Sequence, residues 1–191
     1  GIGASGKDTQ IELLEKYLSD KKNDFLVTRE HTRDTPVGKL IERIIKKQED
    51  QINSEALQLL FISDRRNHFK KVIEPALGEG KLVVGNRYYP VNVAYSTEEW
   101  REKFLKINQM VVDRPDLVIV VDTPPKEALE RMSKRGDEDI FDKLETMEKC
   151  REGYYWYAKN SGDACVLVDG VGTKEEVFHR ILNELKNRRF L

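Results

Sequence analysis

The first nine residues, GIGASGKDT, constrain the fold of this chain more strongly than any other segment. They contain the pattern G-x-x-x-x-G-K, whose fixed positions are Gly1, Gly6 and Lys7. Glycines allow backbone N–H groups to approach phosphate oxygens closely, and the lysine adds a cation between two phosphates. Apolar residues at helical spacing follow over residues 9–18, so a helix N-terminus would point at the same anion. The pattern predicts a phosphate-binding loop.

The residue after the lysine departs from the usual form of such a loop. A serine or threonine normally stands there and binds Mg²⁺ through its hydroxyl group, whereas this chain has Asp8, followed by Thr9. A carboxylate so close to phosphates repels them unless it faces a metal ion or turns away. We expect Asp8 and Thr9 to lie at a Mg²⁺ site.

Strands and helices alternate along the rest of the chain. We expect helices over residues 9–18, 37–47, 54–68, 128–134 and 174–186, and strands over residues 25–28, 81–85, 117–122 and 165–168. The alternation predicts a single α/β domain over residues 1–191, a P-loop three-layer sandwich whose central parallel sheet is covered by helices on both faces. A loop of this kind normally follows a buried strand, and we expect that leading strand to be missing before Gly1.

Charge and composition exclude several classes of protein. The 33 basic and 34 acidic side chains nearly cancel, whereas a nucleic-acid-binding domain usually carries a basic excess. No apolar run approaches the length of about 18 residues that a membrane-spanning helix needs, and we expect no secretory leader. Cys150 and Cys165 belong to no metal-binding motif. We expect a cytoplasmic protein with reduced thiols that binds neither nucleic acid nor a membrane.

Three segments of the chain carry arginines in suggestive places. Residues 28–35, TREHTRDT, come directly after one expected strand, and residues 86–88, Asn-Arg-Tyr, come directly after another. Phe61 and Arg65 lie four residues apart on an expected helix and so share a face. Ligands of open α/β sheets bind beyond the carboxyl ends of the strands, so the segments after the two strands should converge with the loop. Arginine clusters suit phosphate because guanidinium groups form paired hydrogen bonds with it.

Taken together, these motifs resemble the thymidylate kinase family almost from end to end. The family motifs that align are E-G-x-D-x-x-G-K-[ST]-T-Q at residues 1–10, T-R-E-P-G-G-T at 28–35 with one extra residue, L-L-F-x-A-x-R at 59–65 and D-R-Y-x-x-S-x-x-A-Y at 86–95. Asp116, Asp122 and an arginine-rich lid over residues 131–142 also fall in the expected order. Several moderate motifs in the correct order are more specific than any one of them.

The resemblance implies an enzyme that phosphorylates dTMP to dTDP with ATP and Mg²⁺, and that forms a homodimer. It assigns ATP binding to Gly1, Ile2, Gly3, Ala4, Ser5, Gly6, Lys7, Asp8 and Thr9. It assigns dTMP binding to Arg29, Arg33, Phe61, Arg65, Asn86, Arg87 and Tyr95. Within this second set the arginines at 29, 33 and 87 hold the acceptor phosphate. Phe61 stacks on thymine, Arg65 bonds to the base edge, and Tyr95 closes over the sugar.

The same resemblance assigns catalysis to Lys7, Arg87 and an arginine of the lid. Family members without a basic residue inside the loop supply a catalytic arginine from the lid, and residues 2–5 hold no cation here. The candidates are Arg131 and Arg135, which would neutralise the transferring phosphoryl group. The alternative for this helix end is an ordinary solvated surface.

Departures from the family pattern leave two further readings open. Gly3 and Asn86 replace two aspartates of the family, while Asp8 adds a carboxylate, and Val91 and Ser96 replace a serine and a glutamine. We hypothesise that Asp8 holds a metal-bound water that Asn86 cannot hold. The alternatives to dTMP phosphorylation are a kinase for another nucleoside monophosphate and a P-loop protein that binds nucleotide but turns over poorly.

Other conspicuous residues favour structural roles. The three histidines are scattered, and we expect them to be satisfied by neighbours or to face solvent. The aromatic run at residues 154–157 favours a helix end packed on the core over a surface that stacks nucleic-acid bases. Asp122 ends an apolar strand, where it could serve either a metal site or the cap of the next helix.

Overall fold

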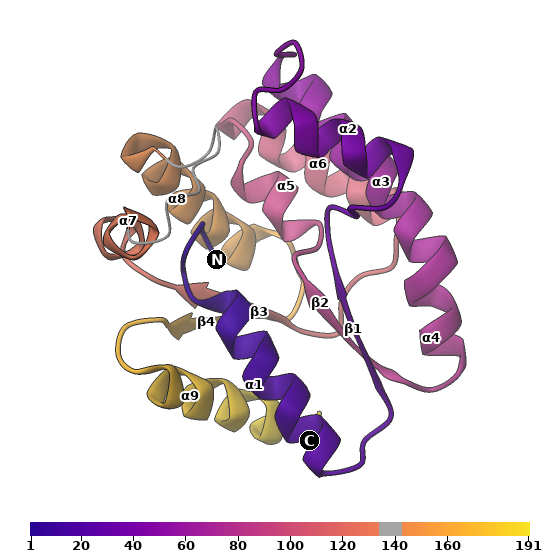
Figure 1. Cartoon of the computed structure of the whole chain (residues 1–191), viewed down its shortest axis with the longest axis vertical. Coiled ribbons are helices and arrows are strands. Elements are labelled where there is room, and N and C mark those ends of the chain that lie inside the picture. The colour runs from indigo at the N-terminus through magenta and orange to yellow at the C-terminus, as the bar shows by residue number, and fades with distance from the viewer. Residues whose placement is uncertain (134–142) are drawn as a thin grey trace.

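The computed structural model describes residues 1–133 and 143–191 of the chain. The strands in this part are β1 (Phe25–Arg29), β2 (Leu82–Asn86), β3 (Val118–Asp122) and β4 (Cys165–Asp169). The helices are α1 (Lys7–Asp20), α2 (Pro36–Ile45), α3 (Ser54–His68), α4 (Glu74–Gly78), α5 (Pro90–Ala94), α6 (Glu98–Val111), α7 (Pro125–Ser133), α8 (Leu144–Asn160) and α9 (Lys174–Asn187), with a π-helical turn η1 (Phe69–Ile73) between α3 and α4. Figure 1 shows their arrangement.

All the strand pairs in the described residues are parallel, as the alternation of strands and helices predicts. β1 pairs with β2 in the register Phe25↔Leu82 to Arg29↔Asn86. β3 pairs with β4 in the register from Val118↔Cys165 onward. The carboxyl ends of β1 and β2 therefore meet at one edge, where the arginine segments begin.

Helices cover both faces of the strands, which confirms the predicted α/β layering. Side chains of a strand alternate between its faces. On one face, Leu82 and Val84 of β2 pack with Leu14 and Leu18 of α1 and Leu182 of α9. On the other face, Val83 belongs to a second cluster, built by residues of η1, α5, α6 and α8 (Phe69, Ile73, Val93, Leu105 and Tyr157).

A groove separates the two strand pairs, because no pairing between β2 and β3 is present in the described residues. The groove has a volume of about 380 Å³, and both strands and the apolar faces of α1 and α9 line it. Its lining includes Val83 and Val84 of β2, Ile119 and Val121 of β3, and Gly1 at its end. In the described residues the parallel strands thus form two pairs, β1 with β2 and β3 with β4, on either side of the groove.

The expected elements are present with ends that differ by a few residues. Among the described residues, α4, α5, α6 and α8 lie outside the helix ranges that we expected. Local capping explains several ends: Pro36 opens α2 behind Thr35, whose side chain accepts a hydrogen bond from the Gly38 N–H, and Asn53 caps α3 in the same way. None of the helices in the described part of the chain is long and apolar enough to cross a membrane.

Candidate active site

The loop that opens the chain turns tightly against the end of β3. A side chain at Gly1 would collide with the carbonyl oxygen of Val121, because a Cβ there would lie 2.1 Å from that oxygen. Gly6 has φ 91°, a left-handed conformation that glycine adopts without strain, and α1 begins directly after it. Thr123 donates a hydrogen bond of 3.1 Å to the carbonyl oxygen of Ser5 and so ties the loop to β3.

Lys7 lies in the first turn of α1 and reaches back over the loop. Its Nζ donates a hydrogen bond of 3.0 Å to the carbonyl oxygen of Ile2. Burial, together with the positive charge of Arg87, lowers the pKa of Lys7 to about 7. The loop lysine therefore lies in an electropositive environment that a bound phosphate would relieve.

Asp8 and Asn86 are in direct contact, although 78 positions separate them in the sequence. Asn86 ends β2, and its Nδ2 donates a hydrogen bond of 2.7 Å to Oδ1 of Asp8. Burial opposes ionisation of Asp8, but the hydrogen bond from Asn86 and the charge of Lys7 outweigh burial and lower the pKa of this carboxyl. Asp8 is exposed to solvent. The contact joins the phosphate loop to the end of β2.

Arg131, one of the two lid candidates, lies beside the loop at the end of α7. Its Nη2 donates hydrogen bonds to Glu127 at 2.5 Å and to the carbonyl oxygen of Gly170 at 3.1 Å. Its Nη1 is 3.6 Å from the position that a Cβ on Gly6 would occupy. The other candidate, Arg135, and nearly all of the expected lid segment lie outside the described residues.

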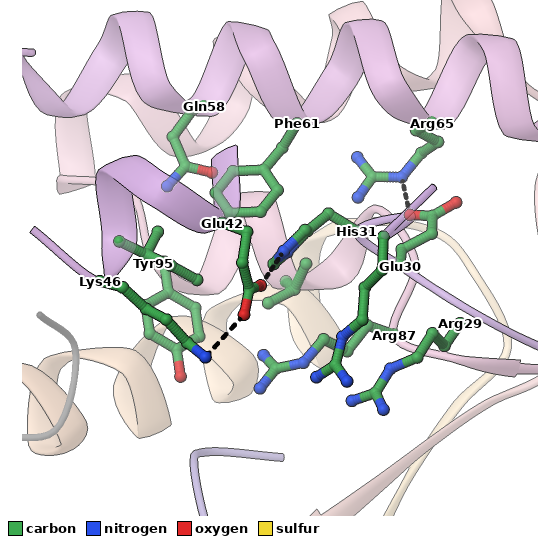
Figure 2. Close-up of a pocket in the computed structure, with 13 residues that line it drawn as sticks. Arg29, Glu30, His31, Glu42, Lys46, Gln58, Phe61, Arg65, Arg87 and Tyr95 are labelled. Carbon is green, nitrogen blue, oxygen red and sulfur yellow. Dashed lines mark hydrogen bonds and ion pairs between the residues drawn. The ribbon is translucent and has the colours of Figure 1, made fainter. Parts of the chain in front are cut away.

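A pocket of about 190 Å³ opens beside the loop. It gathers every acceptor-binding residue predicted from the sequence except Asn86, namely Arg29, Arg33, Phe61, Arg65, Arg87 and Tyr95. Figure 2 shows Phe61 and Arg65 descending from α3 on one side, with Arg29 and Arg87 on the opposite side. The predicted convergence of the arginine segments is therefore present in the structure.

Three guanidinium groups give this pocket its positive charge. Arg29 ends β1, Arg87 follows β2 directly, and Arg33 belongs to the loop between β1 and α2. None of the three forms an ion pair with a carboxylate in the part of the chain that the structure describes. Unpaired arginines at the carboxyl ends of strands can bind a phosphate group through charge-assisted hydrogen bonds.

Asp64 of α3 anchors the loop that carries Arg33. The carboxylate is 1% exposed, and it accepts hydrogen bonds from the backbone N–H of Thr32 at 2.7 Å and from the Thr32 and Thr35 hydroxyl groups at 2.5 and 2.9 Å. A carboxylate that is buried and fully hydrogen-bonded holds its partners in one arrangement. Asp64 therefore fixes the position from which Arg33 projects.

Arg65 is almost completely buried and tightly held. Its Nε donates to Glu30 at 2.6 Å, and its Nη1 donates to the side-chain oxygens of Asn92 and, at 2.7 Å, Asn108. His68 extends the network, because its ring contacts both Glu30 and the hydroxyl group of Thr28. His68 is therefore satisfied by neighbours, as the sequence led us to expect.

The floor of the pocket combines aromatic and acidic groups. His31 contacts the ring of Phe61 edge-on, with centroids 5.6 Å apart, and its Nε2 is 2.7 Å from Glu42. Burial lowers the pKa of His31 and outweighs the opposing influence of Glu42. Tyr95 forms side-chain hydrogen bonds with Arg87 and Cys150. Both histidines near the site are thus engaged by neighbouring side chains.

Arg151 and Tyr155 of α8 engage Asp122 at the end of β3. Its carboxylate accepts two hydrogen bonds from Arg151, at 2.7 and 2.8 Å, and one from Tyr155 at 2.7 Å. Burial opposes ionisation here too, but these bonds outweigh it and lower the pKa of Asp122. Tyr154 and Tyr157 of the same aromatic run are 5% and 0% exposed and pack in the core, as predicted.

Sequence reasoning did not find the polar residues behind the arginines. Glu30, Glu42, Gln58 and Asn92 line or support the pocket but belong to none of the quoted motifs as assigned residues. One signal was present: Gln58, Phe61 and Arg65 recur at helical spacing, which places them on one face of α3. The other three depend on contacts between segments that are distant in sequence.

Comparison with known proteins extends these observations. Residues 1–181 match the family model of thymidylate kinase. A probable thymidylate kinase of Pyrococcus horikoshii is 42% identical over 81% of this chain and 78% of its own length. A relative with the same description from Pyrococcus abyssi is 38% identical over 98% of this chain and 93% of its own length. The corresponding protein of Methanosarcina mazei is 31% identical over 97% of this chain and 92% of its own length.

Proposed function

We propose that this chain, which belongs to the thymidylate kinase family, transfers the γ-phosphoryl group of ATP to dTMP and releases ADP and dTDP. The observation that carries the proposal is the hydrogen bond of 2.7 Å between Asn86 and Asp8. It joins a loop suited to the phosphates of one nucleotide to the end of β2, where the next residue, Arg87, lines a pocket suited to the phosphate and base of another. A two-substrate phosphotransferase requires that proximity.

The charges around the loop suit in-line transfer. An oxygen of the dTMP phosphate attacks the γ-phosphorus of ATP, the bond from that phosphorus to the bridging oxygen breaks, and ADP leaves. Lys7 and Arg87, which are close enough to interact electrostatically, stabilise the charge that develops on the transferring group. Arg131, which lies beside Gly6, supplies a further cation. Arg29 and Arg33 hold the acceptor phosphate, and Phe61 stacks on the base.

The groups around Asp8 fit a hard divalent cation such as Mg²⁺, which prefers oxygen ligands. Asp8 is exposed and ionised beside the loop, Thr9 adds a hydroxyl group, and Oδ1 of Asn86 is a buried oxygen without a hydrogen-bond partner in the described residues. We assign Asp8 and Thr9 to hold the ion together with the ATP phosphates. Mg²⁺ bound there neutralises phosphate charge.

We further infer a cytoplasmic homodimer. The resemblance to the family supports the dimer, and so do two exposed apolar side chains, Leu59 on α3 and Met110 on α6, which are 48% and 83% exposed. Both cysteines are free thiols, which suits a reducing compartment. Light scattering coupled to gel filtration tests the dimer directly, and a single peak at the mass of one chain would overturn it.

A coupled assay of ADP release tests the function. The purified protein is supplied with ATP, Mg²⁺ and, in turn, dTMP, dUMP, UMP, CMP and AMP, and we expect the highest kcat/KM with dTMP. Preference for another acceptor would identify a different nucleoside monophosphate kinase. ATP binding by calorimetry without ADP release from any acceptor would identify a nucleotide-binding protein that lacks this activity.

A further inference from the structure

Gln58 stands out among the residues of the acceptor pocket, because it is a buried amide on the face of α3 that carries Phe61 and Arg65. It is 2% exposed, yet it lines the pocket. Figure 2 shows Gln58, Phe61 and Arg65 projecting from the same helix toward the arginines opposite. A polar side chain that is this buried normally has its hydrogen-bonding groups satisfied.

A chain of hydrogen bonds fixes which end of the Gln58 amide faces the pocket. Arg65 can only donate, so the Asn92 atom that it contacts must be the oxygen, Oδ1. Nδ2 of Asn92 then points the other way and donates a bond of 2.6 Å to Oε1 of Gln58. The Gln58 oxygen is thereby occupied by Asn92. Its NH₂ group, Nε2, has no hydrogen-bond acceptor in the described residues.

Arg65 is left with a similar spare donor. Its Nε and Nη1 donate to Glu30, Asn92 and Asn108. No hydrogen bond from its Nη2 is present among the residues that the structure describes. Asn92 contacts both Arg65 and Gln58, so the two spare donors belong to one hydrogen-bonded cluster that lines the pocket.

We propose that Gln58 reads the acceptor base: its Nε2 donates a hydrogen bond to one ring carbonyl, while Arg65 donates to the other. This assignment rests on the proposed function. Thymine and uracil present two carbonyl oxygens on either side of a ring N–H, which matches two donors. Cytosine and adenine carry an amino group where thymine carries one of these carbonyl oxygens. That amino group would face a hydrogen-bond donor of the protein and could not accept a bond from it. Gln58 is thus a specificity-determining residue for bases with two carbonyl groups.

Two substitutions of Gln58 distinguish a role in binding the base from a role in stabilising the fold. Gln58→Met keeps the length of the side chain but removes both polar atoms. Gln58→Glu keeps an oxygen that accepts the bond from Asn92 and removes only the donor. We expect the KM for dTMP to rise roughly 3- to 10-fold in Gln58→Met and at least as much in Gln58→Glu. The KM for ATP should stay unchanged, and kcat should change by less than about twofold.

Sulfur analogues of the acceptor identify the atom that Gln58 contacts. 2-Thio-dTMP and 4-thio-dTMP each weaken one carbonyl acceptor of the base. Thio substitution at the carbonyl read by Gln58 should reduce kcat/KM in the wild type and have little further effect in Gln58→Met. The proposal would be overturned if both analogues reduced kcat/KM equally in the wild type and in Gln58→Met. A Gln58→Glu variant with wild-type kinetics would overturn it as well.

Gln109→Met serves as the matched control. Gln109 lies on α6, and its amide donates to the carbonyl oxygen of Ser161 at 3.4 Å, outside the pocket. The Gln109→Met substitution should leave the KM for dTMP and the effects of both analogues unchanged. If the wild-type protein phosphorylates no acceptor, the proposed function fails. The role of Gln58 is then still testable, by measuring the binding of dTMP and its thio analogues to the wild type and Gln58→Met by calorimetry.

Discussion

Asp8 illustrates how much of the site could be predicted from single residues. Its place after the loop lysine indicated a departure from the usual metal arrangement, and the hypothesis that it compensates for Asn86 followed from the motif alignment. The sequence could not indicate that the two side chains touch, because the contact joins the first turn of α1 to the end of β2. The hydrogen bond places the carboxylate of Asp8 beside Asn86, where it can take over the role of the aspartate that the family has at that position.

If Asp8 holds the metal ion, Asp8→Ala should reduce Mg²⁺-dependent turnover by roughly 100-fold or more, since a lost metal ligand removes several kcal/mol of charge stabilisation. Titration of kcat against Mg²⁺ concentration measures the effect. The exchange variant Asp8→Ser with Asn86→Asp returns both positions to the family pattern and should recover much of the rate. An undiminished rate in Asp8→Ala would contradict the metal assignment.

His31 predicts a pH dependence of stability at the residue scale. Burial lowers its pKa below 6.5, so the unfolded chain binds a proton more readily than the folded chain. The contribution of His31 to the free energy of unfolding therefore has its full value above pH 6.5, and it decreases as the pH falls through the pKa of the folded state. The free energies of unfolding of the wild type and His31→Gln, measured with urea, should differ less at pH 5 than at pH 7.5. A difference that does not change with pH would contradict this coupling.

The helices and strands differ in how clearly the sequence reveals them. β3 is a run of apolar residues and α9 has a capping box of Thr173 and Glu176, so both were predictable from local chemistry. α6 was missed, because buried Arg101 and Asn108 interrupt the apolar spacing on its inner face. Contacts with distant segments hold both side chains, because Arg101 donates to the carbonyl oxygen of Lys149 and Asn108 accepts from Arg65. No local pattern encodes such contacts.

The loop between β1 and α2 should depend on its anchor in α3. In Asp64→Asn, an amide NH₂ group replaces one carboxylate oxygen and cannot accept, so either the bond from the Thr32 N–H or the bonds from the Thr32 and Thr35 hydroxyl groups are lost. We expect a loss of about 2–3 kcal/mol in the free energy of unfolding and a higher KM for dTMP, with the KM for ATP unchanged.

Asp34→Asn is the control for this change, because Asp34 is exposed in the same loop. It removes the same charge without removing the anchor, and it should alter stability by less than about 0.5 kcal/mol. Chemical denaturation and steady-state kinetics measure both variants. Equal KM values for dTMP in the two variants would indicate that charge near Arg33, and not its anchoring, sets the affinity for the acceptor.

On the scale of the whole molecule, the convergence of the site follows from parallel topology. Arg29 and Arg87 come together because β1 and β2 run parallel in a register that pairs Arg29 with Asn86. The rule that ligands bind beyond strand ends predicted this from sequence alone. The same topology leaves β2 and β3 flanking a groove in which their facing edges have no strand partner among the described residues.

The lining of that groove suits one more parallel strand. Gly1 lies at its end, and Val83, Val84, Ile119 and Val121 line it from both sides. A strand that entered there would complete the hydrogen bonds of both edges and bury apolar side chains on both faces. The strand order would become β1-β2-inserted strand-β3-β4, a continuous parallel sheet with the loop directly after its central strand.

A fusion that places five β-branched apolar residues before Gly1 should therefore stabilise the protein. Burial of these side chains offsets the entropy lost on ordering the segment and leaves a net gain of about 2 kcal/mol or more, which raises Tm by roughly 4–8 °C. The matched control carries proline at the third residue of the fused segment, because proline cannot donate to a neighbouring strand. Thermal unfolding followed by circular dichroism compares the two fusions with the unextended chain. Equal Tm values for the apolar and proline fusions would show that the groove does not accept a strand.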